Sequence, residues 1–182
     1  MLLNRIKLTL LTAIALPLAG CPTFGPPPET VPFVDVERYM GLWYEIASNP
    51  VFFNEDLVGV TAEYTLNDDG TVRVVNRGFE GSLDGPATSI EGVARVVDKE
   101  TNSKLGVRFP SVPGSRFFEG EYWIVALDED YEWAVVSDSR QMTLFILSRE
   151  PAVSVEFFNG LVADLDAADI DTSRLEITGI VE

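Results

Sequence analysis

The residue best placed to do chemistry in this sequence is its single cysteine, Cys21. It directly follows Leu18-Ala19-Gly20, and an apolar stretch from Leu8 to Leu18 leads up to it. Arg5 and Lys7 place positive charge before this stretch, which is too short to span a bilayer comfortably. Because the chain has no second cysteine, an intrachain disulfide is impossible. We therefore interpret Cys21 as a site of covalent lipid attachment.

The N-terminal pattern as a whole resembles a bacterial lipoprotein signal. The resemblance implies that residues 1–20 are a signal peptide cleaved before Cys21, which then carries a diacylglycerol thioether and an N-acyl chain. Several acyl chains anchor a protein durably, whereas one chain is marginal. Pro22 stands where an inner-membrane retention signal would usually be Asp, so we expect an outer-membrane protein facing the periplasm. The alternative is a secreted protein whose cysteine falls there by chance.

The charge of the chain excludes one class of partner. After loss of residues 1–20, 11 basic residues face 29 acidic ones, which gives a net charge of −18. Such a surface repels nucleic-acid phosphates and anionic lipid headgroups. We expect no nucleic-acid partner, and contact with a membrane only through the lipid on Cys21.

Candidates for catalysis or metal binding are weak. Histidine is absent, which removes the commonest general base and metal ligand. The acidic run at Asp164, Asp166, Asp169 and Asp171 lacks the glycine and the final glutamate of a calcium loop, so we assign it to a helix end and a turn. We expect neither an enzyme nor a metal or other cofactor.

Prolines and turn signals divide the rest of the chain. Residues 21–32 contain five prolines and predict a semi-extended tether, followed by a domain over 33–182. Short segments rich in β-branched and aromatic residues alternate there with turn residues and predict eight strands. They lie near 43–49, 57–66, 71–79, 90–98, 103–109, 119–127, 131–137 and 142–148.

This pattern predicts an all-β fold, an eight-stranded up-and-down antiparallel β-barrel. Helical spacing of apolar residues over 154–166 predicts one C-terminal helix, with Ser154 as its N-cap. The late strands are apolar on both faces, so we expect this helix to cover them from outside. Alternation over 175–181 predicts a short final strand.

Charges identify the outer face of each strand, because side chains alternate across it. The opposite phase is apolar and often small, with Ala126 among its members, and we expect it to line a ligand cavity. A barrel filled by its own side chains is the alternative. The predicted cavity residues are Val60, Ala62, Tyr64, Val74, Asn76, Val107, Phe109, Tyr122, Ile124, Val136 and Phe145.

A motif at 35–46, with Gly41-Leu42-Trp43 at its centre, resembles the Gly-x-Trp motif that opens lipocalins, in the form found in bacterial outer-membrane lipocalins and apolipoprotein D relatives. Its companions follow in order: Thr61-Ala62-Glu63-Tyr64, Asn76-Arg77-Gly78, the segment 122–128, and 146–151. The resemblance spans residues 33–181.

The resemblance implies a structural role for Gly41, Trp43 and Arg149, which we expect to close one end of the barrel. The other end would be open, with a mouth formed by the loops near 50–58, 80–89 and 110–118. Phe52, Phe53, Phe117 and Phe118 lie in these loops and would make the mouth apolar.

The function that the resemblance implies is transport or storage of a lipophilic ligand, a fatty acid or lysophospholipid in the bacterial branch. Two alternatives remain open. One is an envelope scaffold whose barrel is idle. The other is a lipocalin-fold enzyme, which the outward phases of the acidic residues disfavour. The sequence does not determine the oligomeric state.

Overall fold

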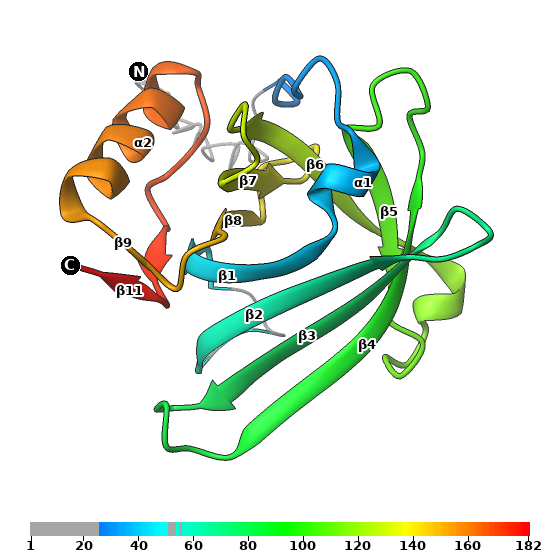
Figure 1. Cartoon of the computed structure of the whole chain (residues 1–182), viewed down its shortest axis with the longest axis horizontal. Coiled ribbons are helices and arrows are strands. Elements are labelled where there is room, and N and C mark those ends of the chain that lie inside the picture. Colours follow the sequence, from blue (N-terminus) through cyan, green and yellow to red (C-terminus); the bar gives the residue numbers. More distant parts are fainter. Residues whose placement is uncertain (1–25, 51–53, 55) are drawn as a thin grey trace, which may run out of the picture.

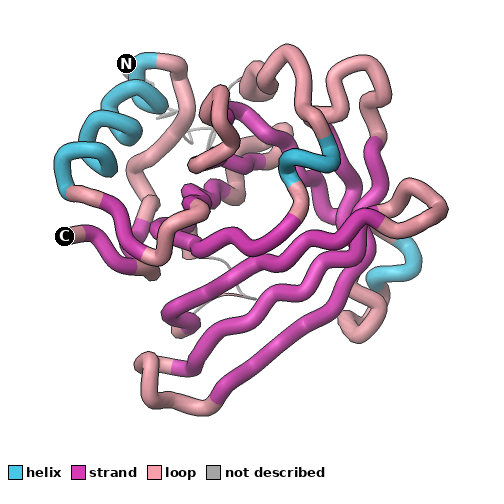
Figure 2. Tube along the Cα trace, viewed as in Figure 1, coloured by secondary structure: helices cyan, strands magenta, loops and turns pink. Residues whose placement is uncertain are grey.

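A computed structural model describes residues 26–50, 54 and 56–182, and strands dominate it (Figure 2). Cys21 and the mouth residues Phe52 and Phe53 lie outside the described residues. The elements are α1 (Val36–Tyr39), β1 (Gly41–Ser48), β2 (Leu57–Leu66), β3 (Val72–Glu80), β4 (Ala87–Val96), β5 (Lys104–Arg108), the 3₁₀ helix η1 (Ser115–Phe117), β6 (Gly120–Leu127), β7 (Trp133–Ser137), β8 (Leu144–Ser148), β9 (Ala152–Val153), α2 (Val155–Ala167), β10 (Glu176–Ile177) and β11 (Ile180–Val181). Neither α1 nor α2, the α-helices of this described part, is long and apolar enough to cross a membrane.

Strands β1 to β8 form a closed antiparallel barrel in meander order (Figure 1). Closure comes from β1, which pairs with β2 along one edge and with β8 along the other, from Tyr44 opposite Ser148 to Ser48 opposite Phe145. Closing the sheet in this way removes the exposed edges of the first and last strands. The predicted eight-stranded up-and-down barrel is confirmed, with strand bounds displaced by a few residues.

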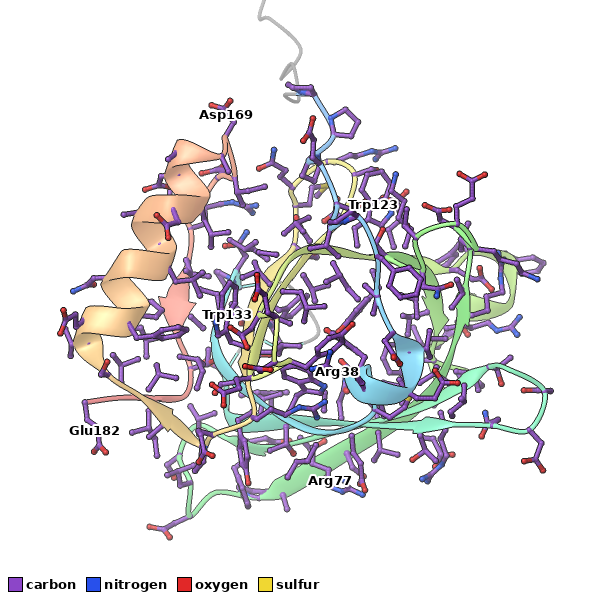
Figure 3. The ribbon with its side chains drawn as sticks, turned by 45° about the horizontal axis from the view of Figure 1, so that its top comes forward. Arg38, Arg77, Trp123, Trp133, Asp169 and Glu182 are labelled. Carbon is purple, nitrogen blue, oxygen red and sulfur yellow. The ribbon has the colours of Figure 1, made fainter. Side chains whose placement is uncertain are left out.

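Helix α2 covers the outside of the late strands, as predicted (Figure 1). Its N-cap is Ser154, whose Oγ accepts a hydrogen bond from the Phe157 amide at 3.2 Å. The helix buries Leu161 and Leu165 against outward-facing residues of β1, β7 and β8. Trp133 of β7 lies on the helix side of the barrel (Figure 3), and its ring centroid is 6.0 Å from that of Phe157. A second apolar layer thus explains why these strands are apolar on both faces.

The C-terminal segment forms two short strands rather than the single strand predicted over 175–181. Strand β10 pairs with β1, and β11 pairs in parallel with β9. Between them the Thr178 and Gly179 amides both donate to the Ile46 carbonyl, at 3.1 and 3.0 Å. A Cβ at Gly179 would lie 2.4 Å from the Glu45 carbonyl oxygen, so only glycine permits this approach. The chain therefore changes strand partner at this glycine.

A bulge in β6 changes which of its side chains point inward. The pairing of β6 with β7 shifts register between Ile124 and Ala126, which inserts Val125 as an extra residue. Ala126 consequently packs in the layer under α2, whereas Leu127 packs against the barrel core. The expectation that Ala126 faces inward was wrong, because alternation resets at a bulge.

The segment before the barrel is packed onto it from Pro28 onward. Pro28 is buried, the Val31 amide donates to the Ile124 carbonyl at 3.0 Å, and the Val34 amide donates to Thr101 at 2.7 Å. Ser103 Oγ donates to Thr30 Oγ1 at 2.9 Å. Contacts with the barrel thus begin at Pro28, within the segment 21–32 that was predicted as a tether. The short helix α1, which the sequence pattern did not predict, follows.

Candidate ligand-binding site

The interior of the barrel is an apolar cluster built from alternate residues of its strands. Most of the predicted cavity residues meet there. Ala62, Tyr64, Val74, Ile124 and Val136 are buried in the interior cluster. Val107, Phe109, Tyr122 and Phe145 pack against that cluster and remain partly exposed. Nine of the eleven predicted residues therefore share one interior.

The two other predicted residues lie outside this apolar cluster. Val60 is half-buried beside Gly59, where the pairing of β2 with β3 shifts register between Val58 and Thr61. Gly59 has a φ of +59°, so the strand bends at this bulge. Val60 is not part of the interior cluster, but its Cγ2 lies 3.2 Å from the position of a Cβ built on Gly78, which shares the inward phase of Asn76.

Asn76 is the polar residue of the predicted lining. Its register places it between Ala62 on β2 and Ile90 on β4, both on inward phases. Its Oδ1 atom is buried and has no hydrogen-bond partner in the structure. Since a buried acceptor without a donor costs about 1–3 kcal/mol, this atom is where a water or a ligand hydroxyl would bind.

The exposed fraction of several inward side chains differs between the two ends of the barrel. At the end near α1, Trp43, Ala134 and Val72 are at most 2 % exposed. Toward the other end the inward residues Ile90, Val107, Phe109 and Phe145 keep partial exposure. Trp43, Ala134 and Val72 therefore pack the α1 end tightly, whereas partial exposure toward the other end is found in Ile90, Val107, Phe109 and Phe145.

Three tyrosines form a hydrogen-bonded group inside the closed half. Tyr122 Oη lies 2.9 Å from Tyr39 Oη and 3.1 Å from Tyr64 Oη. Burial raises the pKa of all three phenols, that of Tyr64 to about 12, so they stay neutral. Three hydroxyl hydrogens serve two hydrogen bonds, which leaves one donor for a further acceptor. Tyr39 was not among the predicted lining residues, because it comes from the short helix α1.

The closed end is held by the predicted trio of Gly41, Trp43 and Arg149. The Arg149 guanidinium carbon lies 3.7 Å from the Trp43 ring centroid. The same guanidinium donates to the carbonyls of Leu42 at 2.7 Å and Met40 at 2.8 Å. Gly41 has a φ of +100°, and a Cβ there would lie 3.3 Å from Arg149 Nη1. These contacts join α1, β1 and β8, which is a structural role.

The open end carries exposed aromatic residues. Phe117 and Phe118, at the end of η1, are 76 % and 62 % exposed. Leu83, in the turn between β3 and β4, is 59 % exposed. The predicted apolar mouth is thus present in these two loops.

Glu45 is a buried acid that the sequence reasoning missed. We expected acidic residues on outward phases and turns, yet Glu45 is 6 % exposed and lies opposite Leu147 of the interior cluster. Its Oε1 accepts from Ser48 Oγ and from Thr178 Oγ1, each at 2.8 Å. Burial raises the pKa of this carboxyl, and the two hydroxyls only partly offset the effect. The signal was available, since Glu45 shares the inward phase of Trp43.

Comparison with known proteins agrees with this architecture. A family model described as a Lipocalin-like domain matches residues 34–179. The chain is 37 % identical over 158 residues to Temperature-induced lipocalin-1 of Arabidopsis thaliana, covering 82 % of this chain and 81 % of that one. It is 36 % identical over 151 residues to Outer membrane lipoprotein Blc of Escherichia coli strain K12, covering 81 % and 82 %. Among solved structures, insecticyanin from the tobacco hornworm Manduca sexta superposes with a TM-score of 0.64 at 18 % identity, covering 87 % of each chain.

Proposed function

The chain belongs to the lipocalin family, and from this premise we propose that it binds a fatty acid or lysophospholipid in the open half of its barrel. The protein would carry or store this ligand in the cell envelope. One observation carries the proposal. The inward-facing apolar side chains of Ile90, Val107, Phe109 and Phe145 stay partly exposed around the open half.

The apolar lining suits an acyl chain. Each methylene transferred from water to such a surface contributes about 0.8 kcal/mol. A dozen methylenes would therefore contribute about 10 kcal/mol before the cost of association. After that cost, which is at least about 4 kcal/mol, about 6 kcal/mol remains, which corresponds to a Kd of about 40 micromolar.

The polar atoms of the interior suit the head of such a ligand. Asn76 Oδ1 is an acceptor without a donor, and the tyrosine group keeps one donor without an acceptor. The glycerol hydroxyl of a lysophospholipid can donate to Asn76 Oδ1. A headgroup near the mouth would leave its charge in water, where charge is least costly.

We propose that acylated Cys21 anchors the barrel to the periplasmic face of the outer membrane. The lipoprotein-like context of Cys21 supports this, as does the relative named an outer membrane lipoprotein. A net charge of −18 would keep the rest of the surface off anionic headgroups, so the lipid would be the main membrane contact.

The proposal is tested by titrating a fluorescent fatty acid into the chain from residue 21 onward, carrying Cys21→Ser so that no acyl chain of its own competes. Lysophospholipids with different headgroups then compete for the site. Failure of both ligand classes to bind below about 100 micromolar, which corresponds to about −5.5 kcal/mol, would end the proposal.

Two further measurements separate binding from the alternatives. Organic extraction of the purified protein should release acyl chains if the barrel is a carrier, and none if it is an idle scaffold. We propose binding rather than catalysis, so candidate lipids should be recovered unchanged by mass analysis after incubation. Any turnover would contradict that part of the proposal.

A further inference from the structure

Strand β4 has a long stretch with a strand neighbour on one side only. Over its length it pairs with β3, from Ala87 opposite Phe79 to Ala94 opposite Val72. On its other edge it pairs with β5 over Val93 to Val96 alone. Figure 1 shows the β3–β4 hairpin extending as a ribbon away from the short β5.

The sequence explains why β5 stops. Its ladder with β4 ends at Arg108, and Pro110 follows two residues later. Proline has no amide hydrogen and cannot continue a ladder of hydrogen bonds. The chain leaves the sheet here and returns only at Gly120, where β6 begins.

A hollow of about 490 Å³ lies beside this part of β4. Its lining is five consecutive β4 residues on one side and Pro110 and Ser111 on the other. The five are Ser89, Ile90, Glu91, Gly92 and Val93. Consecutive residues of a strand point to opposite faces, so what these five share is the strand's edge. The hollow therefore lies along the unpaired edge of β4, between this strand and the segment that follows β5.

The inner end of this hollow adjoins the interior cluster. Gly92 is buried on an inward phase, and a Cβ built on it would lie 2.7 and 2.8 Å from two ring atoms of Phe109. The Phe109 ring thus rests directly on the bare backbone of Gly92. The same ring packs against the interior cluster and remains partly exposed. Phe109 therefore stands between the unpaired edge of β4 and the interior cluster.

We propose that the hollow between Ser89–Val93 of β4 and Pro110–Ser111 is a lateral entrance for the acyl chain of the ligand. The Phe109 side chain would close its inner end. This inference rests on the proposed function. A side opening lets a chain-like ligand slide in while its polar head stays in water. The serines at 89 and 111 keep the outer end of the passage free of bulky side chains.

The test separates an entrance from a binding contact. Ser89→Trp and Ser111→Trp place a large ring at exposed positions of the hollow, and stopped-flow fluorescence follows a fluorescent fatty acid with the chain from residue 21 carrying Cys21→Ser. We expect both variants to slow association and dissociation equally, by about tenfold, and to leave Kd within about twofold. Phe109→Ala should accelerate both rates.

The matched control is Ser82→Trp, the same substitution in the exposed β3–β4 turn at the open end. Slowing by Ser82→Trp without slowing by the other two would place the route through the mouth and overturn the inference. A change in Kd without equal changes in both rates would make the hollow a binding contact instead. If the two tryptophan variants sediment with a lower mass than the unsubstituted chain but bind the ligand at unchanged rates, the β4 edge is a self-association surface. That result also overturns the inference. If the unsubstituted chain does not bind at all, the proposed function itself fails.

Discussion

The Arg149 guanidinium stacks 3.7 Å from the centre of the Trp43 ring and also donates to main-chain carbonyls of α1 and β1. One side chain therefore ties the start of the barrel to the end of β8. Because Trp43 is fully buried, this contact determines whether the closed end of the barrel stays closed.

Replacing Arg149 should destabilise the fold without touching the open half. Arg149→Ala removes a cation–π contact and several charge-assisted hydrogen bonds, so we expect a loss of about 3 kcal/mol in the free energy of unfolding. Arg149→Lys keeps the charge but not the planar fork, and should recover only part of it. Urea denaturation measures both variants. Full recovery by lysine would show that charge alone matters.

Glu45 should make stability depend on pH. Its folded pKa is raised above the ordinary value of 4.5, so its protonated form is favoured by folding. That contribution is fully present below the unfolded pKa and is lost as pH rises through the folded pKa. Glu45→Gln should therefore be more stable than the parent at pH 8 and similar to it near pH 4. Unfolding curves across this range check it, and a constant difference would refute the buried-acid account.

Two glycines should respond to alanine in opposite directions. Gly179→Ala would force a Cβ to within 2.4 Å of the Glu45 carbonyl oxygen, so we expect a loss of about 2 kcal/mol or more as the C-terminal segment detaches from β1. Gly160 lies exposed in α2, and a Cβ there meets nothing within 4 Å. Gly160→Ala should raise stability by about 0.5–1 kcal/mol. Thermal melts of the pair provide the comparison, and equal shifts would contradict it.

Asn76 should distinguish ligands by their polar groups. Asn76→Leu removes a buried acceptor that lacks a donor, so the free protein should gain about 1 kcal/mol of stability. Lysophospholipids, whose hydroxyl we expect to bind Asn76, should bind about tenfold more weakly, which is about 1.4 kcal/mol. Fatty acids should bind as before. Equal weakening of both classes would indicate a change of shape instead.

Acylation of Cys21 should determine whether the protein is bound to the membrane. Cys21→Ala removes the only thiol, so incorporation of a labelled fatty acid should fall to background and the protein should leave the membrane fraction. Fractionation and labelling of the same cultures measure both effects. Retention of the variant in the membrane would show that another part of the chain binds it.

The strands, their order and most of their inward faces were predictable from the sequence, because period-two alternation and turn residues are local signals. The cap at Ser154 and the Gly-x-Trp motif were readable for the same reason. Tertiary pairing decided the rest. The phase reversal at Ala126 and the irregular pairing beside Val60 come from bulges, which exist only in relation to a partner strand. Glu45 shares the inward phase of Trp43 in the sequence, but its hydrogen bond from Thr178, distant in the chain, depends on tertiary packing. The hollow beside β4 likewise follows from where β5 stops pairing, which no residue of β4 encodes.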